Sequence, residues 1–225
     1  MSVLGALQIG RAEQGPNARI GRLFMVGSFC FALASLPFMS DFDARVAGVI
    51  YFIGSVFFTA AGAETFRCVE DGNRLDLVAS AVQLVGTIMF NVNCYAALFD
   101  GLDRHTQKGL VWLPDALGSV AFLIASWIAL VVWQRARRAG SGDRRGGEIA
   151  WLNMIGSLFF GLSAIASQVV GKGEQLNLEA ATWCTFAGAV CFLIGAYLLV
   201  PREPRGTDAA TRRDAPPRRA SSSPA

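Results

Sequence analysis

Six long runs without a charged residue dominate the pattern of apolar and polar positions along this chain. They extend over residues 23–40, 46–63, 77–99, 116–134, 149–171 and 180–201. A helix of roughly 20 residues, which rises about 1.5 Å per residue, crosses a hydrocarbon core about 30 Å thick. Each run is long enough to do so. The pattern therefore predicts six transmembrane helices.

Apolar residues fill odd and even positions of these runs alike, whereas the strands of a membrane barrel would alternate between apolar and polar positions. The whole chain is 53% hydrophobic and 16% charged, which excludes an ordinary soluble domain of this length. The predicted fold class is therefore all-α: a polytopic membrane protein with a six-helix transmembrane bundle over residues 23–200.

Basic residues divide unevenly between the two sets of loops that six spans would create. Sixteen of the 20 lie on the side that holds both termini, and four lie on the other side. Segments rich in Lys and Arg stay in the cytoplasm. We therefore expect a multi-pass protein of the plasma membrane whose N-terminal segment, 1–22, and C-terminal tail, 201–225, are both cytoplasmic.

The tail is rich in Arg, Pro, Ser and Ala and has almost no residue that could build a core. This composition predicts disorder. Its arginines would face the anionic headgroups of the cytoplasmic leaflet. No aromatic side chains interleave with them, so nucleic acid is not an expected partner. The expected partners are the lipid bilayer and its anionic headgroups.

Each apolar run contains the same short motif, in which a Gly is followed directly by a small residue and, four positions after the Gly, by a Phe. The six copies are Gly27-Ser28 with Phe31, Gly54-Ser55 with Phe58, Gly86-Thr87 with Phe90, Gly118-Ser119 with Phe122, Gly156-Ser157 with Phe160, and Gly188-Ala189 with Phe192. Glycines of consecutive spans are 27, 32 and 32 residues apart within the three pairs. This spacing indicates three similar helical hairpins, 23–63, 77–134 and 149–200, derived from one ancestral hairpin.

The motif suits the packing of helices in a membrane. Small residues let two backbones approach closely where lipid and side chains are equally apolar. The Phe lies on nearly the same helix face as the Gly four residues before it, so its ring can fill the notch of a neighbouring helix. We expect these residues to pack the three hairpins with approximate threefold symmetry about the membrane normal.

Two segments also carry a resemblance to a known family. Leu23 to Ser28 and Tyr51 to Phe58, with their order of Phe, aliphatic residue, Gly-Ser and Phe, resemble the paired-helix signature of YrhK-like membrane domains. The resemblance implies a bacterial integral membrane protein and carries over no catalytic residue. It is best in the first and third hairpins. The second hairpin departs from it at Gln83, Asn91, Asn93 and Asp115.

Polar residues within the spans follow a helical spacing. Gln83, Thr87 and Asn91 fall on one stripe of the third span, one turn apart. Asn153 in the fifth span and Asp115 in the fourth span share the position of Gln83, three residues before the motif Gly. The stripe predicts a polar seam between the third, fourth and fifth spans. Such a seam either joins helices by hydrogen bonds or lines a pathway. For Asp115, which follows a proline, capping of a helix N-terminus is an alternative.

These observations favour a structural or regulatory membrane protein whose packing motifs serve folding or association into a homo-oligomer. The alternative is a transporter or channel for a small polar solute or ion along the seam. An enzyme is not expected, because the spans contain no His, no paired carboxylates and no nucleophile with a base. Asp100, Asp103 and His105 form too weak a pattern to predict a metal site, and no cofactor is expected.

The orientation can be tested with a reporter. Alkaline phosphatase needs an oxidising compartment for its disulfides, so a fusion after Ala225 is expected to be inactive in intact bacteria. A fusion in the loop that contains Lys172 should be active and serves as the control. An active C-terminal fusion would overturn the cytoplasmic assignment.

Overall fold

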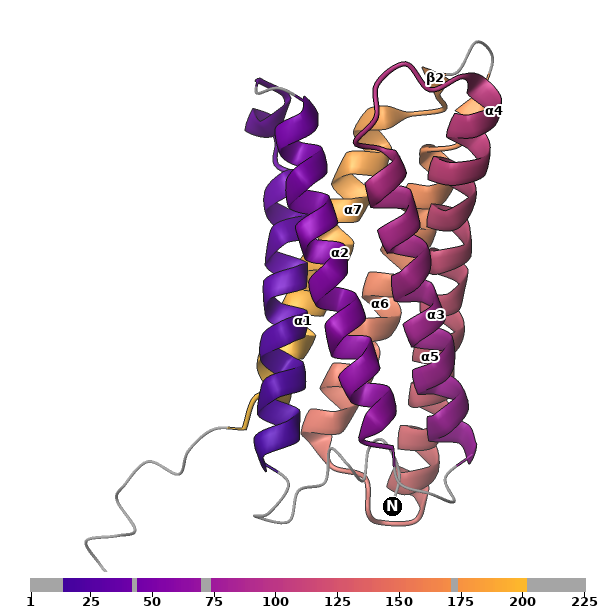
Figure 1. Cartoon of the computed structure of the whole chain (residues 1–225). Coiled ribbons are helices and arrows are strands. Elements are labelled where there is room, and N and C mark those ends of the chain that lie inside the picture. Colours follow the sequence, from indigo (N-terminus) through magenta and orange to yellow (C-terminus); the bar gives the residue numbers. More distant parts are fainter. Residues whose placement is uncertain (1–13, 42–43, 70–73, 171–173, 202–225) are drawn as a thin grey trace, which may run out of the picture.

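The computed structural model describes residues 14–41, 44–69, 74–170 and 174–201. Within these ranges six long helices run between the two ends of the molecule (Figure 1). They are α1 (Gln14–Ala34), α2 (Ala44–Arg67), α3 (Arg74–Ala96), α5 (Leu113–Arg138), α6 (Arg144–Ala166) and α7 (Leu178–Leu199). The short elements are the 3₁₀ turn η1 (Pro37–Asp41), α4 (Arg104–Thr106), the π-helical segment η2 (Gln107–Trp112), β1 (Val169–Val170) and β2 (Glu174–Gln175). The predicted disordered tail, apart from Pro201, and residues 1–13 lie outside the described residues.

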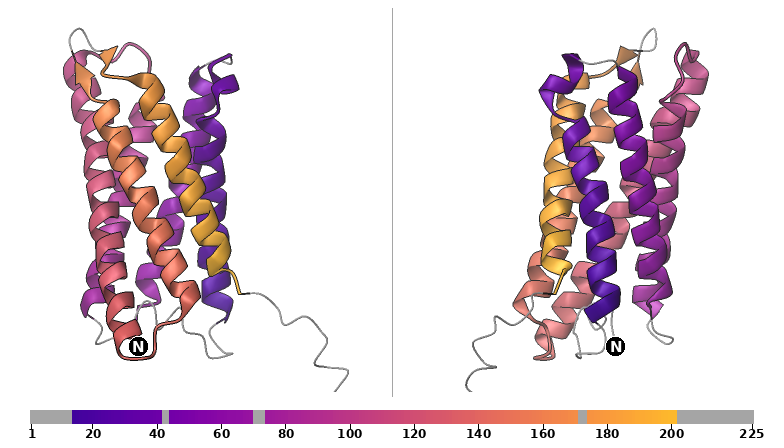
Figure 2. Two further views of the ribbon diagram at one scale, coloured as in Figure 1. Left: turned by 180° about the vertical axis from the view of Figure 1, so that it is seen from behind. Right: turned by 60° about the vertical axis from the view of Figure 1, so that its left-hand side comes forward.

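The six long helices form a closed ring in chain order. Each packs against the next along the chain, from α1 through α2, α3, α5 and α6 to α7, and α7 packs against α1. Consecutive helices run in opposite directions, so both ends of the described chain lie at the same end of the bundle (Figures 1 and 2). We call this end proximal and the opposite end, which carries α4 and the β1–β2 turn, distal.

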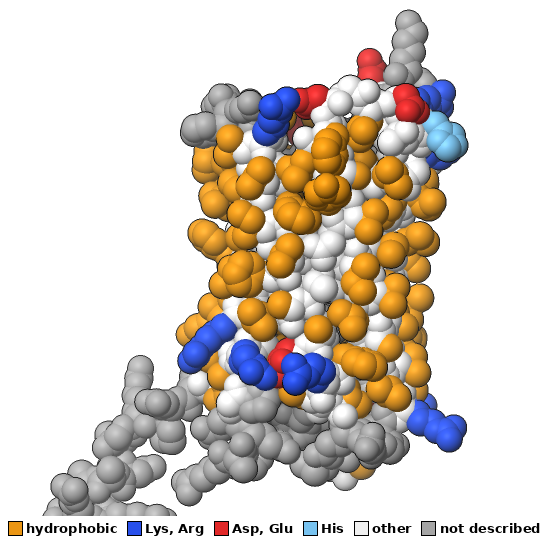
Figure 3. Space-filling model, viewed as in Figure 1, with side chains coloured by type: hydrophobic (Ala, Val, Ile, Leu, Met, Phe, Trp, Pro, Cys, Tyr) orange, Lys and Arg blue, Asp and Glu red, His pale blue; other side chains and the backbone are white. Residues whose placement is uncertain are grey.

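Five helical segments are long and apolar enough to cross a membrane: α2, α3, the continuous helix Arg104–Arg138 that includes α5, α6 and α7. α1 is not among them, and Asn17, Arg19 and Arg22 lie in its first half. Large apolar side chains cover the outside of the bundle between charged rims (Figure 3). Such a surface suits contact with lipid hydrocarbon. The chain is thus an all-α helical membrane protein.

Two helices end several residues before the end of the apolar run that predicted each of them. α1 ends at Ala34 rather than near Ser40, because Pro37 has no N–H to continue a helix and instead begins η1. α6 ends at Ala166, and the apolar residues of β1 that follow pair antiparallel with β2. At its other end α1 begins at Gln14, well before the apolar run. Apolar character therefore located each helix but not its limits.

The glycines of the sequence motif meet in pairs inside each hairpin. A Cβ added to Gly54 on α2 would lie 3.0 Å from the carbonyl oxygen of Gly27 on α1, and one added to Gly27 would lie 3.0 Å from that of Gly54. The same reciprocal approach joins Gly86 to Gly118 at 3.1 and 3.0 Å. It also joins Gly156 to Gly188, at 3.1 and 2.9 Å. Because each added Cβ would meet a backbone carbonyl oxygen and a Phe ring of the partner helix, a larger residue at these positions would force the two helices apart.

The phenylalanines of the six motifs form one layer across the middle of the ring. They are Phe31, Phe58, Phe90, Phe122, Phe160 and Phe192, and each is at most 8% exposed. Their ring centroids lie 5.1 to 6.4 Å apart, mostly edge to face. Such pairs each contribute about 0.5–1.5 kcal/mol beyond the burial of area. Every helix thus contributes one ring to a shared phenylalanine layer.

The small residue after the glycine contacts the neighbouring hairpin in two of the three interfaces between hairpins. Ser157 on α6 donates a hydrogen bond to the carbonyl of Phe122 at 3.2 Å, and Ser119 on α5 donates one to the carbonyl of Phe160 at 3.2 Å. Ser55 on α2 lies 2.8 Å from Oδ1 of Asn91 on α3. At the α7–α1 interface, Ser28 is buried and its hydroxyl has no hydrogen-bond partner among the described residues. Two of the three interfaces between hairpins are therefore joined by these hydroxyl groups as well as by apolar contact.

Polar groups fix several helix ends. Nε of Arg145 donates to the carbonyl of Leu198 at 2.5 Å, and its Nη2 donates to that of Val200 at 2.8 Å. These carbonyls belong to the last turn of α7, where a helix has no intrahelical donors. Asp143 caps α6 through the amide of Gly146 at 3.1 Å, and Asn177 caps α7 in the same way. Arg145 thereby joins the start of α6 to the end of α7 at the proximal side, whereas Asn177 caps α7 at the distal side.

Two glycines of α2 provide a matched test of the backbone contact. Gly54→Ala should lower the stability of the bundle by about 1–3 kcal/mol, as overpacking does in cores, because its Cβ would meet Gly27 and the Phe31 ring. Gly62→Ala should be neutral or slightly stabilising, since its Cβ would have no neighbour nearer than 3.5 Å and Ala favours a helix over Gly. Thermal unfolding of both variants in detergent measures the difference. Equal effects of the two substitutions would contradict the glycine contact.

Candidate functional site

Cavities lie inside the ring on both sides of the phenylalanine layer, and we call the larger one on each side the proximal and the distal cavity. The proximal cavity is lined by Phe58, Phe122 and Phe192, and the distal cavity by Phe31 and Phe90. Because these rings belong to one packed cluster, the layer forms the inner wall of both cavities and separates them.

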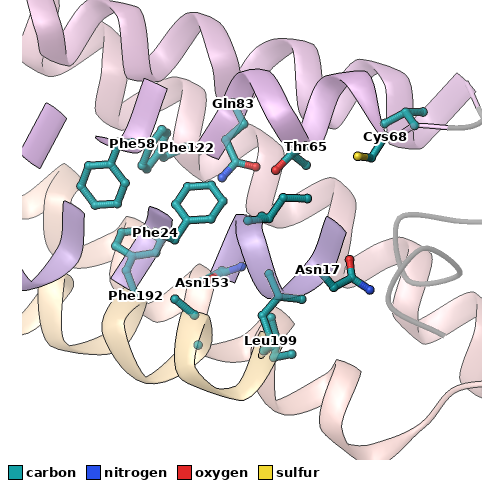
Figure 4. A pocket seen from close by; sticks show the side chains of 15 residues that line it. Asn17, Phe24, Phe58, Thr65, Cys68, Gln83, Phe122, Asn153, Phe192 and Leu199 are labelled. Atoms are coloured by element: carbon teal, nitrogen blue, oxygen red, sulfur yellow. The ribbon is translucent and has the colours of Figure 1, made fainter. Parts of the chain in front are cut away.

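The proximal cavity has a volume of about 110 Å³. It reaches Cys68 and Leu199 at the ends of α2 and α7, and its walls are mostly apolar (Figure 4). Its polar lining includes the side-chain amides of Gln83 and Asn153, which come from α3 and α6. A smaller adjoining cavity of about 80 Å³ is lined by the same two amides. Two of the predicted seam residues therefore do come together, in the proximal half.

The distal cavity is larger, with a volume of about 250 Å³. A single water needs only about 10–15 Å³ of such space, so a small organic molecule can be accommodated. Its aromatic lining consists of Phe31, Tyr51, Phe90 and Trp112. Its polar lining comes from α3, η2, α5, α6, β2 and α7 and includes Asn93, Gln107, Asp115, Ser163, Ser167, Gln175, Thr182 and Thr185.

Asp115 is the carboxylate of the distal cavity. Ser167 Oγ donates a hydrogen bond to its Oδ2 at 3.3 Å, and the side chain of Asn93 also hydrogen-bonds to it. Asp115 does not cap a free helix N-terminus, which corrects the alternative considered from the sequence. The helical residues of α4 and η2 precede it without a break, and the amide of Leu113 already bonds to the carbonyl of Lys108. The carboxylate is held by side chains and faces the cavity.

Two aromatic side chains of the distal cavity are fixed by hydrogen bonds. The indole Nε1 of Trp112 donates to the carbonyl of Ala164 at 2.9 Å. The hydroxyl of Tyr51 lies 2.7 Å from Oγ of Ser35, and its ring meets that of Phe31 edge to face at 5.2 Å. Trp112 ends the π-helical segment, a type of irregularity that is frequent at functional sites. These hydrogen bonds hold the two rings in place.

The predicted seam between the third, fourth and fifth spans is not continuous, and this part of the prediction is wrong. Asn91 turns toward α2, where it bonds to Ser55 and Thr59, and Thr87 is fully buried with its hydroxyl on the carbonyl of Leu84. Asp115 lies on the distal side of the phenylalanine layer, whereas Gln83 and Asn153 lie on the proximal side. Residues four apart do not lie exactly above one another on a helix. In addition, the Phe90 ring lies on the bundle axis between the proximal amides of Gln83 and Asn153 and the distal carboxylate of Asp115. The seam is therefore split into two.

Several residues of the distal cavity were not predicted as a site. Tyr51 comes from α2, Trp112 from η2 and Ser167 from the residue after α6, and only the closing of the ring brings them to Asp115. Asn93 offered a signal, because it is a polar residue in the apolar third span. It lies off the stripe formed by Gln83, Thr87 and Asn91.

Asp100 and Asp103, which lie in the loop between α3 and α4 at the distal end, do not assemble a metal site. Asp100 forms an ion pair with Arg45. Asp103 caps α4, and hydrogen bonds from the hydroxyl and then the amide of Thr106 lower the pKa of its carboxyl. No cluster of three or more His, Cys, Asp or Glu side chains suited to a metal ion occurs in the described part of the chain.

Comparisons of the chain with protein-family models, with curated proteins and with solved structures gave no match.

Proposed function

We propose that this chain is a six-span protein of the plasma membrane, with α1 as the sixth span, that moves a small polar solute or ion through its helical ring. One observation carries the proposal: two cavities with polar linings approach the same phenylalanine layer from opposite ends. Polar and ionisable groups inside membrane proteins often mark such pathways. The layer then acts as a closed barrier between them.

The environment of the polar residues supports movement of a solute over a purely structural role. Side chains that only join helices should be satisfied by one another, as Asn91 is by Ser55 and Thr59. Asn153 and Gln83 instead line the proximal cavity. Asp115 is hydrogen-bonded by Ser167 and Asn93 but also lines the distal cavity. A structural or regulatory role, which the sequence favoured, is the second candidate and is supported by the three glycine contacts.

The proposal also covers the orientation of the chain, its origin by duplication and its partners. With both termini in the cytoplasm, the proximal cavity would open inward and the distal cavity outward. The glycine contact that recurs in three hairpins, together with the resemblance to YrhK-like domains, supports descent from one duplicated hairpin in a bacterial protein. The proposed partners are the bilayer, its anionic headgroups and a second copy of the chain. The proposal includes no enzymatic activity and no cofactor.

Reaction with a membrane-impermeant thiol reagent distinguishes the two roles. In a variant whose five native cysteines are replaced by alanine, Gln83→Cys should react from the proximal side only. Asn93→Cys should react from the distal side only. Thr87→Cys should react from neither side, because Thr87 is fully buried beside the phenylalanine layer.

The sidedness is measured in sealed vesicles of both orientations, and size-exclusion chromatography shows that each variant is folded. A folded protein in which neither position 83 nor position 93 reacts would favour the structural role instead.

A further inference from the structure

Among the described residues, no charged side chain pairs with the carboxylate of the distal cavity. Asp115 is bonded by two neutral side chains, and it takes part in no ion pair within the described residues. Three carboxylates at the rims of the bundle differ from it in this respect. Glu64 pairs with Arg19, Asp100 with Arg45, and Glu148 with Arg144. A partly buried ionised carboxylate is stabilised by a positive partner, so the distal cavity favours a cationic ligand.

The remaining walls of this cavity select the kind of cation. Calcium takes six to eight oxygen ligands and magnesium demands an octahedral set, whereas Asp115 is the one acidic residue among the described residues that line the cavity. Four aromatic rings, those of Phe31, Tyr51, Phe90 and Trp112, line it as well. Aromatic faces attract ammonium groups, and quaternary ammonium ligands are recognised in this way.

The ring of Trp112 has an ammonium neighbour within the chain itself. Nζ of Lys108 lies 5.9 Å from its centroid, within the range of a cation–π contact. Lys108 is not among the residues that line the distal cavity. The distal cavity, of about 250 Å³, is therefore lined by the Asp115 carboxylate and by aromatic rings. No lysine or arginine is among its described lining residues.

We propose that the distal cavity binds a small organic ammonium ion, with Asp115 as its counter-charge and the Tyr51 and Trp112 rings as its walls. This inference names the substrate class of the proposed transport function and rests on that function for its physiological meaning. Binding itself requires only the cavity, so it can be measured in the purified full-length protein without any transport.

The test is calorimetric titration of the full-length protein in detergent with tetramethylammonium chloride at constant ionic strength. We expect saturable binding that Asp115→Asn weakens at least about tenfold, because the amide keeps the shape and removes the charge. Asp103→Asn is the matched control, since this residue is exposed and caps α4; it should bind like the wild type. The uncharged analogue tert-butanol should not compete with tetramethylammonium.

Three results would overturn the inference: no saturable binding to the folded wild type, equal binding by folded Asp115→Asn, or displacement of tetramethylammonium by equimolar sodium. If Asp115→Asn does not fold, the wild-type competition with sodium and tert-butanol decides alone. Failure here combined with thiol labelling from both sides would leave the pathway and remove only the ammonium class. Binding without such labelling would leave a ligand site and remove the pathway.

Discussion

Within each hairpin, two helices approach until the backbone of one glycine touches the backbone of the other, and the arrangement of the ring follows from that distance. The carbonyl of Gly27 lies 3.0 Å from where a Cβ of Gly54 would stand, and the other two pairs repeat this geometry. Successive residues of a helix point about 100° apart at 3.6 residues per turn. The residue after the glycine is thereby turned toward the next hairpin, and the Phe one turn later is turned toward the axis.

The phenylalanine layer is a direct consequence of this arrangement. Six rings from six helices meet at one level, and no polar side chain can remain on the axis there. Polar groups are consequently displaced. Thr87 bonds to its own helix and Asn91 bonds toward α2, whereas Gln83 and Asp115 face space on opposite sides of the layer. The same packing that holds the bundle together therefore creates two cavities and the barrier between them.

The sequence predicted the class of fold and the packing residues better than it predicted the candidate site. Apolar runs and the recurring glycine motif are local signals, and both depend on the neighbours of a residue along one helix. The distal cavity depends instead on which helices become neighbours when α7 packs against α1. Ser167 and Trp112 carry no signal of their proximity to Asp115, because they belong to separate segments. Pro114 suggested a helix start at Asp115, but the preceding residues of η2 continue the helix. A helical stripe cannot show that a ring from another span will divide it.

If the phenylalanine layer blocks passage between the two cavities, removal of one of its rings should open a path between them. Phe122 is 2% exposed and lies in the layer, whereas Phe29 on α1 is 57% exposed on the outside of the bundle. In liposomes that contain equal amounts of folded protein, Phe122→Ala should raise the flux of potassium or tetramethylammonium well above that of the wild type. Phe29→Ala should leave the flux unchanged. A folded Phe122→Ala protein with wild-type flux for both cations would contradict the account.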